Sequence, residues 1–369
     1  MKVNCINTNF DNRKNHPAKT NFSGYFACPL KEVYLQPSYT LGFDVLVKNF
    51  IESTRQYFDV VVQYKDRLLK NDFVKNPRGE FQDFIYANCW SQDNKVFLEN
   101  GKLGIFQKHQ AKDVAIDLAE KLKTKTHLID NDFEGGNFFL GKKQNGDNII
   151  LAGVDSVKNV DRQQISEIFN IKNENIFTIP QPDYHIDLMI RPLTYPDVLV
   201  GDIDLTLEKA RNNSSSGLYR DSYFRFLEKK KAEKTEENRK YGLNFASTET
   251  IVKTLEEQGF NPIKVPGVLY KNDVNYMNAL VHQNPDGTMV YITNKSDRIA
   301  SGIDFDNIFA ESLKEQVPAV KKIIFMESAV DRNGHSMLSA YLSKSDGGGL
   351  HCLTNERPDF EAWNKFNIS

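Results

Sequence analysis

The sequence predicts an α/β fold built from repeated units that pack round a central axis. One observation is that the same order of elements recurs along the chain: a short amphipathic helix, a buried strand, a polar turn and a hairpin. A second is that polar turn residues recur at similar intervals, since Asp93 and Glu134 are 134 − 93 = 41 positions apart and Glu134 and His185 are 185 − 134 = 51 apart. Such a period is typical of repeated supersecondary units, and units round an axis would bring these turns together at one end.

Four amphipathic helices are expected where apolar residues recur three or four positions apart. They cover residues 113–122, 161–170, 249–258 and 306–317. Asp161 is the expected N-cap of the second helix, and Gly259 is expected to end the third in the left-handed conformation. Strands are expected at residues 60–62, 138–141, 148–153, 176–180, 188–192, 198–201, 262–265 and 323–326, and residues 284–287 (NPDG) suit a hairpin turn.

The chain divides into an N-terminal segment, residues 1–50, and one large domain, residues 51–369. The segment is expected to hold either a first strand or a lid. Residues 207–241 are strongly charged and interrupt the repeating order. We interpret them as an insertion, either a solvated helix or a mobile loop, with a docking arm for a protein as the alternative.

The composition excludes several classes of protein. Of the 369 residues, 40% are hydrophobic and 26% are charged, as in soluble globular proteins. A net charge of −2 gives no electrostatic basis for binding nucleic acid or an anionic membrane. No apolar run is long enough to span a bilayer, and the first residues lack the apolar core of a signal peptide. Cysteines at positions 5, 28, 89 and 352 have no zinc spacing, so we expect a cytoplasmic protein with a reduced thiol at Cys352.

Residues 347–354 (GGGLHCLT) form the most distinctive stretch of the sequence. Three consecutive glycines allow the backbone to approach a ligand closely. Cys352 follows them, flanked by histidine and leucine, as a nucleophile on such a turn would be. The alternative is a glycine-rich turn beside a buried cysteine.

Three motifs upstream carry acids or a histidine: residues 90–93 (WSQD), 134–137 (EGGN) and 185–187 (HID). Each alone has a structural explanation, as a polar turn, a hairpin turn, or an ion pair or half of a metal site. Together with Cys352 they suit chemistry on a guanidinium group. Carboxylates bind its N–H donors in pairs, a thiolate can attack its central carbon, and histidine carries protons.

These four motifs resemble those of the guanidino-group-modifying superfamily, which has the pentein fold. The family includes agmatine, arginine and peptidylarginine deiminases and amidinotransferases. Residues 347–354 resemble the nucleophile motif of agmatine deiminases, whereas residues 90–93 are closer to the peptidylarginine deiminase form. Residues 134–137 match the arginine and agmatine deiminase pattern, and residues 185–187 are similar to the motif that all members share. The resemblance implies an α/β propeller of five ββαβ modules around a pseudo-fivefold axis, with residues 51–369 as its catalytic domain.

The resemblance also implies a reaction. Cys352 would attack the guanidinium carbon and expel ammonia, leaving a thiouronium adduct. His185 would protonate the leaving ammonia and then activate water, and Glu134 would orient His185. The catalytic residues would therefore be Cys352, His185, Glu134 and Asp187. The residues around the substrate would be Asp93, Asp187, Glu134, Trp90, Gly348 and Gly349. No metal or organic cofactor takes part in this chemistry.

The motifs mix two subfamilies, so the substrate stays open among agmatine, free arginine and a protein-bound arginine side chain. An amidinotransferase that uses the same adduct is the first alternative. A pentein-fold binding protein without turnover is the second, and a papain-like Cys–His hydrolase is the third. The expected partners are a small guanidino substrate or a protein arginine side chain, with no nucleic acid and no membrane. The oligomeric state is open, a homodimer included.

Overall fold

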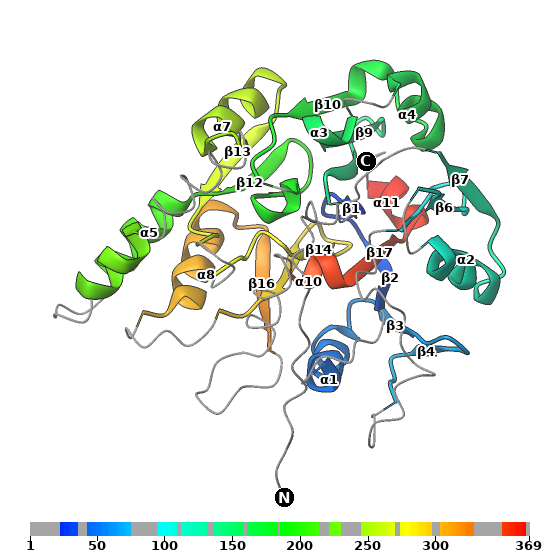
Figure 1. The fold of residues 1–369 in the computed structure, drawn as a ribbon, viewed down its shortest axis with the longest axis horizontal. Helices are drawn as coiled ribbons and strands as arrows, with labels where there is room; N and C mark the ends of the chain where they lie inside the picture. Colours follow the sequence, from blue (N-terminus) through cyan, green and yellow to red (C-terminus); the bar gives the residue numbers. More distant parts are fainter. Residues whose placement is uncertain are drawn as a thin grey trace, which may run out of the picture.

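Five separate β-sheets form the framework of the protein in the computed structural model (Figure 1). The structure describes residues 23–35, 43–74, 94–108, 112–130, 136–157, 161–183, 185–213, 221–229, 245–269, 274–296, 303–327 and 349–366. Two of the sheets have four strands and three have three. Each contains the same core: an antiparallel strand pair, followed through a helix by a strand parallel to the second member of the pair. The helix is needed because two parallel strands cannot be joined by a short turn.

Two of these units occupy the first half of the chain. One consists of β5 (Lys95–Phe97), β6 (Leu103–Phe106), α2 (Lys112–Lys121) and β7 (Thr126–Ile129). The next consists of β8 (Phe138–Lys142), β9 (Asn148–Gly153), α3 (Val154–Val157), α4 (Arg162–Phe169), η2 (Asn173–Asn175) and β10 (Ile176–Ile179). An additional strand, β1 (Ser23–Tyr25), lies parallel to β8 at the edge of this second sheet.

Two further units follow in the second half. One begins with η3 (Ile186–Leu188) and contains β11 (Ile190–Pro192), β12 (Asp197–Gly201), α5 (Ile203–Asn212), α7 (Thr248–Glu257) and β13 (Asn261–Val265). The other contains β14 (Leu280–Gln283), β15 (Met289–Asn294), α8 (Phe305–Gln316) and β16 (Val320–Met326). The four expected helices and the eight expected strands are therefore present, with bounds that shift by a few residues.

The fifth unit combines both ends of the chain. Here β17 (Thr354–Pro358) pairs antiparallel with β2 (Leu30–Leu35), and α1 (Phe43–Thr54) leads from β2 to the parallel strand β3 (Asp59–Gln63) and its neighbour β4 (Leu68–Lys70). The short helices α10 (Leu350–Leu353) and α11 (Phe360–Phe366) flank β17. The division expected between residues 50 and 51 falls inside α1, so it does not separate two structural units. Residues 23–35 instead supply strands to the common framework.

Local signals in the sequence account for the ends of several elements. The Asp161 side chain accepts a hydrogen bond from the Gln163 backbone N–H at 3.0 Å, which caps α4 as expected. Gly259 follows α7 with φ of +83°, in the left-handed region where glycine carries no steric penalty. Gly287 in the hairpin turn between β14 and β15 has φ of +80°.

The charged segment 207–241 is only partly described, and the described part is helical and packed. Residues 207–212 complete α5, and residues 221–229 form a further helical stretch. Their apolar side chains Leu207, Ala210, Phe224 and Leu227 are buried in one core cluster with residues from the two units of the second half. These described residues are helical, as one of the two expectations for the segment had it, but their apolar faces contribute to the core.

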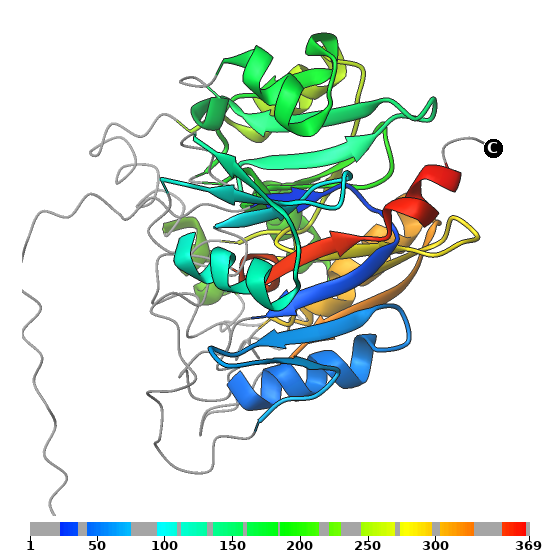
Figure 2. The ribbon, with the colours of Figure 1, turned by 90° about the vertical axis from the view of Figure 1, so that its right-hand side faces the viewer.

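The helices that join strands within the units lie at the periphery, whereas the short helices α10 and α11 lie nearer the middle of the molecule (Figure 1). Figure 1 shows α1, α2, α4, α7 and α8 at successive positions round the outside, with β1 and β17 near the centre. In Figure 2 the C-terminal strand β17, drawn in red, lies beside the N-terminal strand β2, drawn in blue. The order of elements agrees with five ββαβ modules, whereas closure into a propeller about a pseudo-fivefold axis stays a prediction. No helix in the described parts of the chain has the length and low charge needed to cross a bilayer.

Candidate active site

The thiol of Cys352 lies in α10, a single helical turn directly before β17, and its residue is fully buried. The Leu350 N–H donates to Asn294 Oδ1 at 2.9 Å, and the Cys352 N–H donates to Asn278 Oδ1 at 3.2 Å. Side-chain amides of the neighbouring unit thus satisfy backbone N–H groups that a helix start leaves unpaired. Gly349 precedes this turn, and a Cβ there would come within 2.5 Å of both Asn278 Oδ1 and Asn294 Nδ2. Close packing against the two amides therefore requires glycine at this position.

One amide group connects the thiol to a carboxylate. Asn278 Nδ2 donates to Asp187 Oδ2 at 2.8 Å and to Cys352 Sγ at 3.1 Å. Asp187 Oδ2 lies 3.9 Å from Cys352 Sγ. The Asn278 backbone N–H donates to Asn275 Oδ1 at 3.1 Å, which fixes the residue from behind. A hydrogen bond from Asn278 stabilises negative charge on sulfur, whereas the carboxylate so close to it opposes that charge.

Asp187 is a buried carboxylate with one oxygen held by the protein. It belongs to η3, directly before β11, and its backbone N–H donates to Gly136 O at 3.2 Å. Its Oδ2 is paired with His351 Nδ1 at 2.9 Å, in addition to Asn278. Its Oδ1 is buried and has no hydrogen-bond partner among the described residues. Since an unpaired buried carboxylate oxygen is costly, Oδ1 is the natural acceptor for an N–H donor of a ligand.

His351 lies between two buried carboxylates. Its Nδ1 is paired with Asp187, and its Nε2 lies 3.6 Å from Glu356 Oε2. The imidazole ring stacks on Phe139, with ring centroids 5.7 Å apart. Gly24 of β1 packs against the same ring, because a Cβ on Gly24 would come within 2.6 Å of His351 Nε2. The orientation of this imidazole is thus fixed on several sides.

A buried ion pair supports this arrangement from the far side of His351. Arg191 Nη2 donates to Glu356 Oε1 at 3.0 Å, and both side chains are fully buried. The Tyr25 backbone N–H donates to Glu356 Oε2 at 2.9 Å. Burial by itself raises the pKa of Glu356, but the charge of Arg191, His351 and the Tyr25 N–H together lower it below its ordinary value. Glu356 is therefore a buried anion beside the candidate site.

The contacts of the site join successive units of the fold. Asp187 and Cys352 each precede the first strand of their unit, and Asn278 occupies the same place before β14. The Ile186 N–H donates to Asn137 Oδ1 at 3.1 Å, and Asn137 directly precedes β8. The segments that begin four units thus contact one another in sequence. This agrees with the expectation that polar turns of repeated units gather at one end.

The structure describes only some of the residues predicted for the site. It brings Asp187 and Cys352 together, as described above. His185 is buried at the N-cap of η3, two residues before Asp187. Gly349 lies at the start of α10 beside Asn278. The remaining predicted site residues lie outside the described residues: Trp90, Asp93, Glu134 and Gly348.

Several residues of the site were not predicted from the sequence. Asn278 could have been found, because it precedes the first strand of its unit as Asp187 and Cys352 do. His351 stands in the glycine–cysteine motif but received no role. Glu356 and Arg191 carry no local signal, since nothing near them in the sequence shows that they pair across 165 positions. Among the described residues, no group of three or more His, Cys, Asp or Glu side chains could hold a metal ion.

Comparison with known proteins gives likeness in structure but not in sequence. No protein-family model and no curated protein matches this chain. The agmatine deiminase of C. jejuni aligns over 91% of this chain and 95% of its own, with 15% identity and a TM-score of 0.50. A cysteine-to-serine variant of that enzyme with substrate bound aligns over 91% and 96%, with 16% identity and a TM-score of 0.51. A protein provisionally named a peptidyl-arginine deiminase aligns over 93% and 99%, with 12% identity and a TM-score of 0.52.

The chain has the pentein fold. The alignments cover nearly the whole of both chains, so the likeness concerns the complete arrangement and not one unit. Because the sequence identity is only 12% to 16%, these structural alignments establish the fold and nothing more. The reaction therefore has to be argued from the residues of the site. The candidate active site lies at the end of the sheets where the first strand of each unit begins.

Proposed function

We propose that this protein is a deiminase that hydrolyses the guanidino group of an arginine-like substrate to a ureido group and ammonia. The observation that carries the proposal is the proximity of Cys352 and Asp187, which come from different units and share the amide of Asn278. The Asp187 carboxylate can bind the guanidinium cation of the substrate, and the Cys352 sulfur can attack its central carbon. The pentein fold shared with an agmatine deiminase supports the same class of reaction.

Asp187 would bind the substrate through Oδ1, the oxygen that has no partner among the described residues. Its Oδ2 is held by Asn278 and His351, so the orientation of the carboxylate is set before substrate arrives. Its Oδ1 would then accept an N–H of the guanidinium. A charge-assisted hydrogen bond of this kind is about twice as strong as a neutral one. The bound cation would also offset the repulsion between Asp187 and a thiolate at Cys352.

The proposed reaction has two steps. Cys352 Sγ attacks the guanidinium carbon, a C–S bond forms, and the C–N bond to one terminal nitrogen breaks as His185 gives that nitrogen a proton. Ammonia leaves, and the substrate remains on sulfur as a thiouronium. Water, deprotonated by His185, then attacks the same carbon, and the C–S bond breaks to return the thiol and release the ureido product.

The other residue roles in this proposal come from the resemblance. Glu134 would orient His185 and help hold the cation, and Asp93 would clamp a second pair of guanidinium N–H groups. Trp90 and Gly348 would lie beside the substrate. Gly349 keeps its place next to the substrate in the proposal, although its described contacts are with Asn278 and Asn294.

The covalent adduct gives a direct test. The protein is mixed with agmatine, arginine or an arginine-containing peptide, quenched in acid, digested and analysed by mass spectrometry. We expect the peptide that carries Cys352 to gain the mass of the substrate minus ammonia. Cys28 is the internal control, since it is buried elsewhere and its pKa is raised by burial, so its peptide should stay unmodified.

Two outcomes would point away from a hydrolase. If Cys352 gains only the amidino group, the substrate's amine is released, and a new guanidino compound forms only when an amine acceptor is added, without ammonia or ureido product, the protein is an amidinotransferase. If substrates bind and no adduct forms on Cys352 with any of them, the protein is a binding protein of the pentein fold and the proposal is wrong.

A further inference from the structure

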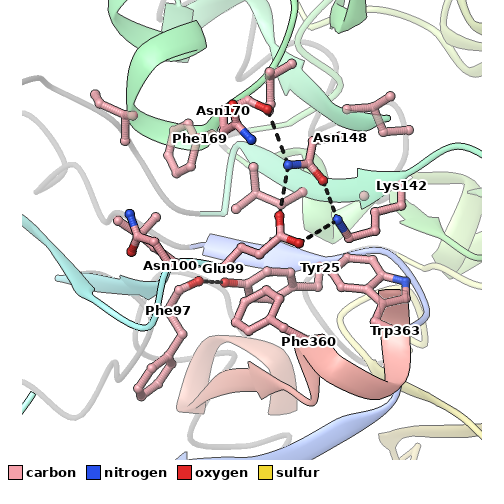
Figure 3. Close-up of a pocket in the computed structure, with 16 residues that line it drawn as sticks. Tyr25, Phe97, Glu99, Asn100, Lys142, Asn148, Phe169, Asn170, Phe360 and Trp363 are labelled. Carbon is pink, nitrogen blue, oxygen red and sulfur yellow. Dashed lines mark hydrogen bonds and ion pairs between the residues drawn. The ribbon is translucent and has the colours of Figure 1, made fainter. Parts of the chain in front are cut away.

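A cavity of about 330 Å³ lies at the opposite end of the strands from the candidate active site (Figure 3). Asn137, which contacts the candidate active site, lies just before β8. The cavity is lined by Leu140 and Lys142 near the end of the same strand. At about 3.3 Å per residue, the far end of β8 is roughly 13 Å from its start. The cavity is therefore a separate place in the fold, with walls from three units.

Aromatic side chains form much of the cavity wall. Tyr25 lies edge-on to Phe360 and to Trp363, with centroid distances of 6.3 and 6.0 Å. Phe169 completes the ring-lined part of the wall, whereas the Phe97 ring points away from it and stacks on Tyr34 (Figure 3). Rings arranged in this way favour a flat ligand, because aromatic faces and edges both pack well against another ring. The volume is at the lower end for ligand pockets and suits a molecule of one or two rings.

One carboxylate faces this aromatic wall and is held in place. Glu99 accepts hydrogen bonds from Lys142 Nζ at 3.1 Å, from Asn148 Nδ2 at 3.1 Å and from Asn364 Nδ2 at 2.9 Å. Burial by itself raises the pKa of Glu99, but these three partners together lower it below its ordinary value. The side chain of Glu99 is 34% exposed, whereas that of Lys142 is only 5% exposed. Since a carboxylate accepts about four hydrogen bonds, Glu99 can take one more from a ligand.

The charges around the cavity narrow the choice of ligand. The Lys142 ammonium balances the Glu99 carboxylate and lies 5.6 Å from the Trp363 ring centre, so the polar wall has little net charge. A cationic ligand would be repelled by the Lys142 ammonium, and an anionic ligand would be repelled by the exposed oxygen of Glu99. An uncharged ring with an N–H donor at its edge fits both the aromatic rings and the open acceptor.

We propose that this cavity binds an uncharged, flat nitrogen heterocycle of nucleobase size, with a ring or exocyclic N–H donated to Glu99. The ring of the ligand packs among Tyr25, Phe360 and Trp363. The site is independent of the proposed reaction, because none of its residues takes part in chemistry at Cys352.

Calorimetric titration of the full chain with adenine tests this proposal, with caffeine as the matched probe. Caffeine is a neutral purine of similar shape whose N–H groups are all methylated. We expect saturable binding of adenine and at least about tenfold weaker binding of caffeine, as one hydrogen bond to a charged acceptor would give. Cys352→Ala should bind adenine like the native protein. Equal affinity for the two purines, or loss of binding in Cys352→Ala, would overturn the assignment.

Two variants distinguish adenine binding in the cavity from adenine binding at the nearby surface. Glu99→Gln keeps the shape and removes the charge, and we expect it to weaken adenine binding by about tenfold. Glu361→Gln changes an exposed acid on α11 that pairs only with Lys365 in the described contacts, and it should have no effect. Because Glu99→Gln could also disturb folding, quenching of Trp363 fluorescence by adenine in Trp90→Phe is a second measurement. Unchanged fluorescence there, or unchanged affinity in Glu99→Gln, would contradict the proposal.

Discussion

At the scale of single residues, Asn278 holds the candidate site together. Its one amide group donates to the thiol and to the carboxylate, and its carbonyl oxygen accepts from the Cys352 backbone. The residue therefore sets both the distance between Cys352 and Asp187 and the stability of negative charge on sulfur.

Asn278→Ala removes the N–H donor to the Cys352 sulfur and the oxygen that accepts from the Cys352 backbone N–H. We expect alkylation of Cys352 by iodoacetamide to slow by about tenfold, because a thiolate that loses a hydrogen bond is less populated. The rate is followed by mass spectrometry of the Cys352 peptide. Asn284→Ala is the matched control, since Asn284 bonds only within its hairpin turn in the described contacts. An unchanged alkylation rate in Asn278→Ala would show that the contact has no effect on the thiol.

Asp187→Asn keeps the shape of the side chain and removes its charge. We expect KM to rise and kcat to fall together, with kcat/KM lower by at least about a hundredfold, since the charge is used before and during the reaction. Steady-state kinetics on the substrate that turns over fastest measures both constants. Asp66→Asn, which changes an exposed acid, is the control. A change confined to the pH profile would contradict a role in binding the cation.

At the scale of elements, two positions beside helix ends require glycine for different physical reasons. Gly259 follows α7 at φ of +83°, and the nearest atom to an added Cβ would be 3.9 Å away. Gly349 precedes α10 in extended backbone, but its Cβ would collide with Asn278 and Asn294. The first position needs glycine for conformation and the second for space.

The two glycines therefore give opposite results when changed to alanine. Gly259→Ala should lower the free energy of unfolding by about 1 kcal/mol and leave kcat/KM unchanged, because only the left-handed backbone is strained. Gly349→Ala should lower kcat/KM strongly, because it displaces the amide that contacts Cys352. Denaturant unfolding and kinetics on both variants check this pair. Equal loss of activity in the two would indicate a general effect on folding.

At the scale of the whole molecule, the ion pair of Arg191 and Glu356 joins three units near the site. Arg191 belongs to β11 and Glu356 to β17, and the backbone of Tyr25 in β1 bonds the same carboxylate. Breaking a buried pair leaves an uncompensated charge, which costs about 3–5 kcal/mol. Glu356→Gln should destabilise the whole fold by this amount at neutral pH.

The same residue predicts a pH dependence. The pKa of Glu356 in the folded protein is below its ordinary value of 4.5, so its contribution to stability is complete above that value. The contribution is lost as pH falls through the lowered folded pKa. Denaturant unfolding between about pH 5 and pH 3 should therefore show a smaller loss of stability in Glu356→Gln than in the native chain. Equal slopes would mean that Glu356 is not ionised in the fold, and Glu361→Gln on the exposed face of α11 is the control.

The sequence predicted the repeated units and placed Asp187 and Cys352 in one site, but not the supports of that site. Helix caps such as Asp161 and Gly259 are local signals, and the recurring polar turns gave the position of Asp187. The pairing of β17 with β2 and of Arg191 with Glu356 joins residues far apart in the chain, for which local patterns carry no signal. The division placed at residue 50 falls inside α1, and the strand partner of β2 lies at the other end of the sequence.

Turnover is the measurement that tests the central claim most directly. Ammonia release and formation of ureido product are followed in parallel with agmatine, free arginine and an arginine-containing peptide, in the absence of any amine acceptor. We expect one of the three to give both products in equal amounts and Cys352→Ala to give neither while still binding that substrate. Equal turnover by Cys352→Ala and the native protein would contradict a mechanism through this thiol, and no product from any of the three would contradict the deiminase itself.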